Sequence, residues 1–247
     1  MTGTILNIIT VILGSTIGML FGAHIPEQLK STVIAGMGLF TAAMGLQMFL
    51  KTGNPLIVLG ALLIGILLGE WWRIEDGLQS LGQILEKRFA KSNAEVGSSK
   101  FVRGFLTASL LFCIGPMTIL GSIQDGLRGD YSLLAVKSVL DGFTSLALSS
   151  SLGMGVLFSS IVILIFQGGI SFLAMQLNVS VTNAMADPAM KAVIDSMIDE
   201  LTATGGVILV GLAISSLLEI KKIRVGNFLP ALAIAPLIVW ILSAIPK

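Results

Sequence analysis

Two charged residues, Lys137 and Asp141, stand in a stretch that otherwise reads as membrane-spanning sequence. If residues 132–149 form one helix, Asp141 lies near its middle, where a charge costs roughly 2.5–3.5 kcal/mol on insertion scales. Lys137 lies one helical turn earlier, and Ser145 and Ser149 lie one and two turns later, so all four share one face. This face is expected to point away from lipid.

Two interpretations of this face stay open. In the first, it lines a polar pathway or a substrate site inside a helical bundle. In the second, Lys137 and Asp141 form an ion pair that only locks helix packing. Further polar residues in the next expected span, Ser159 and Gln167, extend the polar lining beyond what one ion pair needs, and they favour a pathway.

A proline inside an apolar stretch is the next candidate. Gly115-Pro116 lies within the expected span 101–123, and proline removes a backbone donor and clashes with the preceding turn. We expect the helix to kink or break there. Broken helices often line binding sites in transporters, so Pro116 joins the candidate pathway, although a simple packing kink is the alternative.

The composition places these residues in a membrane protein. Hydrophobic residues make up 54% of the 247 residues and charged residues only 12%, about half the charged share of a soluble protein. The mean hydropathy is +0.94. Apolar runs of roughly 17–21 residues suit α-helices and not the short alternating strands of a barrel. The predicted fold is all-α, a polytopic inner-membrane bundle of about eight transmembrane helices, with seven possible.

The expected spans divide the chain into two membrane halves. They cover residues 3–21, 31–50, 56–71, 101–123, 132–149, 153–173, 205–218 and 228–245. The first half, residues 1–90, ends in an amphipathic helix at 74–89, and a polar cytoplasmic linker, residues 91–100, follows. The second half, residues 101–247, contains an amphipathic acidic helix at 188–201, begun by Asp187 as N-cap and Pro188 at the first helical position.

The first span carries a stripe of small residues, Gly14, Gly18 and Gly22, which allows another membrane helix to approach closely. Asn7 adds an amide to this span. It is interpreted mainly as an interhelical hydrogen-bonding residue, and alternatively as part of a transport path.

Basic residues give the expected orientation. Ten of them fall in segments that lie on one side if the amino terminus is outside, and four fall on the other side. The ten are Lys30, Arg73, Lys87, Arg88, Lys91, Lys100, Arg103, Lys221, Lys222 and Arg224. The positive-inside rule therefore places both termini on the outer side of the membrane.

Several chemistries are not expected. The single cysteine, Cys113, lies in an apolar stretch, so we expect neither an intramolecular disulfide nor a thiolate metal site. The sequence has no HExxH motif, nucleophile elbow or P-loop, which argues against an enzyme. No cofactor, metal or nucleic-acid partner is predicted.

The order of motifs resembles the YqgA/YdfK-like family of bacterial membrane proteins, domain of unknown function 554. The matching stretches are 3–22, Gly69-Glu70, 111–117, 121–127, 137–142, 153–156 with Ser159, Gln167-Gly168, 202–206 and 229–231. The resemblance covers nearly the whole chain. It implies a bacterial inner-membrane protein described only as a possible transporter or channel, and it supplies no site residues.

The leading functional hypothesis is a transporter of a small solute or ion, with Asp141 as a protonatable or cation-binding group and Lys137 as its partner. A passive channel in the form of a homo-oligomer is the first alternative. A scaffold or partner subunit that transports nothing, with the helices 74–89 and 188–201 as docking faces, is the second.

Overall fold

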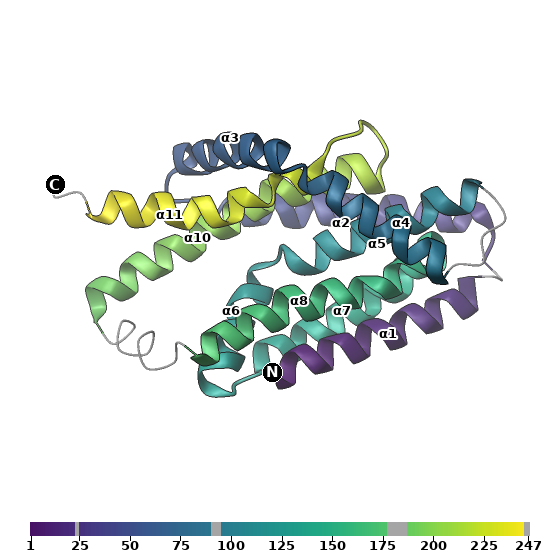
Figure 1. Cartoon of the computed structure of the whole chain (residues 1–247), viewed down its shortest axis with the longest axis horizontal. Coiled ribbons are helices and arrows are strands. Elements are labelled where there is room, and N and C mark those ends of the chain that lie inside the picture. Colours follow the sequence, from purple (N-terminus) through teal and green to yellow (C-terminus); the bar gives the residue numbers. More distant parts are fainter. Residues whose placement is uncertain (23–24, 90–94, 177–186, 245–247) are drawn as a thin grey trace.

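The protein is a bundle of long helices, several of which run side by side along its longest dimension (Figure 1). The structure, a computed structural model, describes residues 1–22, 25–89, 95–176 and 187–244. Within these ranges every regular element is helical. The elements are α1 (Thr2–Gly22), α2 (Glu27–Phe49), α3 (Pro55–Trp72), α4 (Ile74–Phe89), α5 (Glu95–Cys113), α6 (Pro116–Arg128), α7 (Ser132–Leu152), α8 (Gly155–Gln176), α10 (Pro188–Leu212), η1 (Ala213–Leu217), η2 (Val225–Phe228) and α11 (Pro230–Ala244).

The number of spans agrees with the sequence. Seven helices of the described chain are long and apolar enough to cross a membrane, and the count rises to eight if α5 and α6 form one bent span. The all-helical, polytopic membrane fold is therefore confirmed. The linker predicted at 91–100 differs in part, because α5 begins at Glu95; residues 91–94 lie outside the described ranges.

The acidic helix predicted at 188–201 is not a separate element. It is the first part of α10, which continues through Leu212 into the π-helical segment η1, a run of 30 residues in all. Asp187 caps it as expected, with its side chain accepting a hydrogen bond from the Ala189 amide at 3.0 Å. Gly206 lies within α10. Its lack of a side chain lets α10 approach the backbone of α2 at Gly45.

Glu200, in the acidic first part of α10, is buried at 3% exposure. Its carboxylate accepts hydrogen bonds from the Thr52 hydroxyl at 2.7 Å and from the backbone amides of Gly53 and Asn54 at 2.9 and 3.0 Å. Glu200 therefore fastens α10 to the turn between α2 and α3.

The span that contains Gly115-Pro116 is broken, as predicted. α5 ends at Cys113, Gly115 is extended, and α6 starts at Pro116. The two segments are bent by 60°. The Thr118 hydroxyl donates to the Phe112 carbonyl at 2.9 Å, so one of the carbonyl groups freed by the break regains a partner.

Two groups of helices lie on either side of α5 (Figure 1). The first bundle is formed by α1, α6, α7 and α8, and the second by α2, α3, α10 and α11. Glycines allow the closest approaches within each bundle: a Cβ atom on Gly14 or Gly18 of α1 would overlap a backbone carbonyl oxygen of α7. In the second bundle, a Cβ atom on Gly65 of α3 would meet the backbone of Ala231 in α11.

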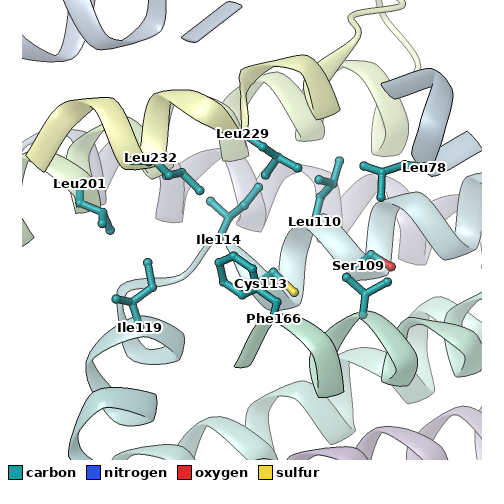
Figure 2. A pocket seen from close by; sticks show the side chains of 12 residues that line it. Leu78, Ser109, Leu110, Cys113, Ile114, Ile119, Phe166, Leu201, Leu229 and Leu232 are labelled. Atoms are coloured by element: carbon teal, nitrogen blue, oxygen red, sulfur yellow. The ribbon is translucent and has the colours of Figure 1, made fainter. Parts of the chain in front are cut away.

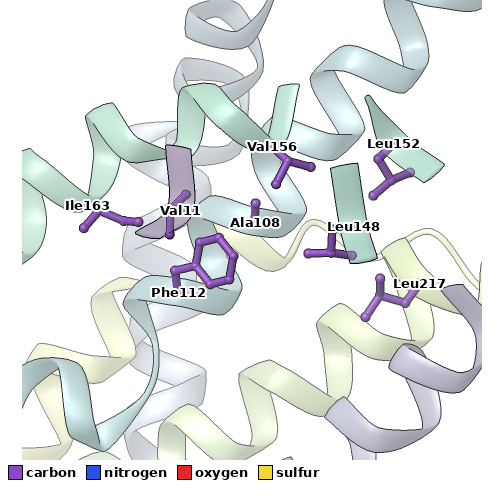
Figure 3. Close-up of a cluster of buried hydrophobic side chains, with 8 residues drawn as sticks. All are labelled: Val11, Ala108, Phe112, Leu148, Leu152, Val156, Ile163 and Leu217. Carbon is purple, nitrogen blue, oxygen red and sulfur yellow. The ribbon is translucent and has the colours of Figure 1, made fainter. Parts of the chain in front are cut away.

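A buried apolar cluster joins α5 to the first bundle (Figure 3). Val11 of α1, Phe112 of α5 and Leu148 of α7 lie at its centre, and all three are almost completely buried. Leu217 of η1 reaches the same cluster. The cluster packs beside the polar residues of α7 and holds α5 in place next to them.

The amphipathic helix α4 has the predicted bounds and is tied down at its start. The Glu75 carboxylate accepts from the Gly226 amide at 2.7 Å, and Arg224 forms ion pairs with Glu70 and Asp76. Hydrogen bonds from Arg73 and Arg224 hold the pKa of Asp76 below its usual value of 3.8. α4 is thus joined to the connection between η1 and η2.

Candidate functional site

Lys137 and Asp141 form an ion pair on α7, one turn apart. Their side chains are only 6% and 12% exposed. The Lys137 ammonium also lies 5.9 Å from the centre of the Phe112 ring of α5, within range of a cation–π contact. The pair is therefore withdrawn from the protein surface and sits next to the end of α5.

Asn7 of α1 connects this pair to α8. Its Nδ2 group donates to Oδ2 of Asp141 and to Oε1 of Gln167, both at 3.0 Å. Nε2 of Gln167 donates in turn to the Thr4 hydroxyl at 3.3 Å. Asn7 thus makes the interhelical hydrogen bonds that we expected, and it also contacts Asp141 directly. The structure brings Lys137, Asp141 and Gln167 into one network.

The serines predicted to extend this lining lie elsewhere. Ser145 and Ser149 face the glycine stripe of α1, and the Ser145 hydroxyl donates to the Val11 carbonyl at 3.2 Å. Ser159 of α8 is buried and donates to the Val156 carbonyl of its own helix at 2.6 Å. These hydroxyl groups serve helix packing in this structure, and their role in a pathway stays a prediction.

A cavity of about 350 Å³ lies against the ion pair, between the two bundles. We call it the α2–α7 groove. Among its lining residues are Lys137 and Asp141 of α7 and Gly115 at the helix break. Two of its lining residues, Phe40 and Leu140, are 68% and 53% exposed, so the groove is open to the outer surface of the helical bundle beside them. Pro116 begins α6 beside it, and its side chain lies outside the described ones.

The largest share of the groove lining comes from α2, a helix that the sequence did not single out. The lining includes Met37, Thr41, Met44 and Met48 of α2 and Lys51 in the turn after it, which follow one another at four, three, four and three positions. This spacing places them on one helical face. The threonine and the lysine at the end of this face were the sequence features that could have marked it as a lining, but its methionines look like ordinary membrane-facing residues.

A second cavity, of about 290 Å³, lies on the other side of the helix break (Figure 2). Ile114 and Phe166 point into it, as does Leu232 from α11. Its lining is almost entirely apolar, with Ser109 and Cys113 as the least apolar members. The α5–α6 break therefore separates an apolar cavity from the groove that contains the ion pair.

Asp125 of α6 is another buried carboxylate that the sequence analysis did not select. It is 3% exposed, and its Oδ2 atom accepts from the Gly3 amide at 3.1 Å and pairs with the amino group of Met1 at 2.9 Å. It fixes the start of α1 against α6. In the described part of the chain, no cluster of three histidine, cysteine or acidic side chains is placed to hold a metal ion.

The family model described as "Protein of unknown function (DUF554)" matches residues 2–240 of this chain. The "Uncharacterized membrane protein YdfK" of Bacillus subtilis (strain 168) is 32% identical over 248 aligned residues, which cover 99% of this chain and 98% of the relative. The "Uncharacterized protein YqgA" of Escherichia coli (strain K12) is 30% identical and covers 94% of each chain. No solved structure matches the chain. The resemblance of the motifs is thus confirmed, and the protein belongs to the DUF554 family of membrane proteins.

Proposed function

We propose that the protein transports a small solute or ion through the α2–α7 groove, with Lys137 and Asp141 as the polar contact for the solute. One observation carries the proposal: the ion pair forms part of a cavity wall and is not sealed between packed helices. The pair is held in position by Asn7 and borders a broken helix, as polar groups in the binding sites of transporters often do.

The energetics of a buried ion pair favour a role in function over a role in helix packing. A buried ion pair contributes little net stability, and well-packed apolar residues of similar volume often replace it without loss. The glycine contacts between α1 and α7 already hold these two helices together. A charge pair next to a cavity therefore adds little to packing, but it supplies the polar surface that a solute needs within a membrane.

The arrangement of the helices suggests how access would alternate. Close backbone contacts fasten the helices within each bundle, and the groove lies between the bundles. Small rotations of one bundle against the other would open the groove toward one side of the membrane and then the other. The bent α5–α6 segment lies between the two bundles, so such a rotation would change its bend.

The orientation is part of the same proposal. Connections that fall on one side when successive spans alternate in direction contain Arg73 and Arg224, and Lys30 and Arg103 lie near the helix ends on that side. We place this side in the cytoplasm and both termini outside, in the cytoplasmic membrane of a bacterium.

The test is solute flux in proteoliposomes made with purified protein. Uptake of sodium, chloride, acetate, alanine and octanoate is measured with and without a pH gradient. We expect one of these solutes to enter faster than into empty vesicles, and we expect Asp141→Asn and Met44→Trp to abolish the difference. Leu63→Trp is the matched control, because Leu63 is an exposed α3 residue that does not line the groove.

Absence of protein-dependent flux for every solute would refute transport. Flux that persists without saturation as the solute concentration rises would instead identify a passive channel. Flux that Met44→Trp and Leu63→Trp leave unchanged would place the path outside the α2–α7 groove.

A further inference from the structure

The lining of the α2–α7 groove is unusual for a small hydrophilic ion, because most of it is apolar. Four methionines contribute to it, Met37, Met44 and Met48 from α2 and Met117 from α6, together with phenylalanine and leucine side chains. Methionine is flexible and polarizable, so it adapts to apolar ligands of varied shape. The polar groups are few, and they lie near the ion pair and along one face of α2.

The groove has room for a single chain. Its lining runs from Met37 in α2 to Lys51 in the turn after this helix. A volume of about 350 Å³ holds roughly a dozen groups of the size of a water molecule, at about 30 Å³ each. One apolar chain fits these dimensions, whereas the two chains of a phospholipid do not.

The charges in the lining are unequal. Lys51 and Lys137 are the cations, and Asp141 is the one carboxylate among the described lining residues. Asp141 is already shared between Lys137 and the amide of Asn7. Lys51 is exposed, and Glu200 of α10, which contacts the turn that follows Lys51, accepts three hydrogen bonds from that turn.

The amino-terminal end of α6 adds to this excess of positive charge. Gly115 and Met117, at the amino-terminal end of α6, line the groove. The first amides of a helix carry the positive end of its dipole. The groove therefore offers an apolar lining for the chain of an amphipathic ligand and a positively charged region for the polar end of that ligand.

We propose that the groove binds an amphipathic organic anion, a carboxylate with a single apolar chain of about eight to ten carbons. The carboxylate lies toward Lys51 and Lys137, and the chain lies along the methionine face of α2. The sideways opening between Phe40 and Leu140 gives such a molecule a route from the apolar part of the bilayer. The inference rests on the proposed function, because it names the class of solute for the same groove.

Binding is tested separately from transport, by calorimetry on the full-length protein in nanodiscs. The probes are octanoate, acetate, which lacks the chain, and octylammonium, which reverses the charge. Heats from the Met44→Trp variant in identical nanodiscs are subtracted, because this variant fills the groove and leaves partition into lipid unchanged. We expect octanoate to bind at least about tenfold more tightly than acetate or octylammonium.

A second variant tests the charge. Lys51→Gln is expected to weaken octanoate binding about tenfold and to leave octylammonium binding no weaker. Lys191→Gln is its control, because Lys191 is an exposed lysine of α10 outside the groove lining.

Three results would overturn the inference. They are equal affinity for octanoate and octylammonium, equal affinity for octanoate and acetate, and heats that Met44→Trp leaves unchanged. Failure of the proposed transport function gives a different result. In that case octanoate binds selectively, but no solute in the flux assay crosses the membrane.

Discussion

Neutralising Lys137 and Asp141 separately and together distinguishes a pathway from a packing contact. Lys137→Met leaves the Asp141 carboxylate buried with only the Asn7 amide as donor, and Asp141→Asn leaves the Lys137 ammonium buried without its anion. The loss of one member of a buried ion pair costs about 3–5 kcal/mol of unfolding free energy. Each single variant should therefore be strongly destabilised.

The double variant has a different expected cost. It contains no unmatched charge, and the new amide oxygen at position 141 still accepts a hydrogen bond from Asn7, so the remaining loss is about 1–2 kcal/mol. If the pair acts on the solute, the double variant should fold well and show no flux. Stability is measured by thermal unfolding in detergent, followed by tryptophan fluorescence, and flux is measured in proteoliposomes.

The control is a surface pair with similar spacing. Lys30 pairs with Glu27 at 2.9 Å, and the Glu27 side chain is 76% exposed. Glu27→Gln should change the unfolding free energy little and leave flux intact, because the substituted side chain is the exposed member of the pair. Wild-type flux in the Lys137→Met, Asp141→Asn double variant would refute the pathway and leave the pair as a structural contact.

Three further predictions concern packing, orientation and acid stability. Gly18→Leu should cost about 1–3 kcal/mol or prevent folding, because its side chain would overlap α7, whereas Gly36→Ala, with no atom within 4 Å of the added Cβ, should keep wild-type stability in a detergent melt. In a Cys113→Ser background, a membrane-impermeant maleimide added to intact cells should label Ser196→Cys and not Ser80→Cys; the reverse pattern would invert the orientation. Because its arginine partners lower the pKa of Asp76, their contribution is present above pH 3.8 and is lost as the pH falls below it. The protection factors of α4 amides, which correct hydrogen exchange for the intrinsic rate at each pH, should therefore fall under these acidic conditions in the wild type, and Asp76→Asn should show low protection factors at neutral pH as well.

The positions of the helices followed from local properties of the sequence. Apolar runs marked the spans because each backbone must satisfy its own hydrogen bonds within lipid, and this requirement needs no neighbour. The break at Gly115-Pro116 followed from the chemistry of proline, and the cap at Asp187 from a local hydrogen bond. The extent of α10 did not follow, because the helix 188–201 and the span 205–218 were read as two elements, and the structure joins them in one.

The candidate site was predicted only in part. A lysine and an aspartate one turn apart are recognisable in any apolar stretch, so Lys137 and Asp141 were identified from their rarity alone. Gln167 was grouped with them correctly, since Asn7 connects it to Asp141. Ser145 has the spacing for the same face, but it donates to the backbone of α1 rather than lining the groove.

The sequence by itself determined that this is a helical membrane protein of the DUF554 family, where its spans lie and which two charges interrupt them. Only the tertiary structure decided that Asn7 meets Asp141, that Glu200 fastens a turn and that α2 supplies the largest share of the groove lining. The reason is physical. In a soluble protein a buried face differs from an exposed one in hydropathy, but lipid and protein interior are both apolar, so the face that a membrane helix turns toward its neighbours is fixed by close packing and long-range hydrogen bonds.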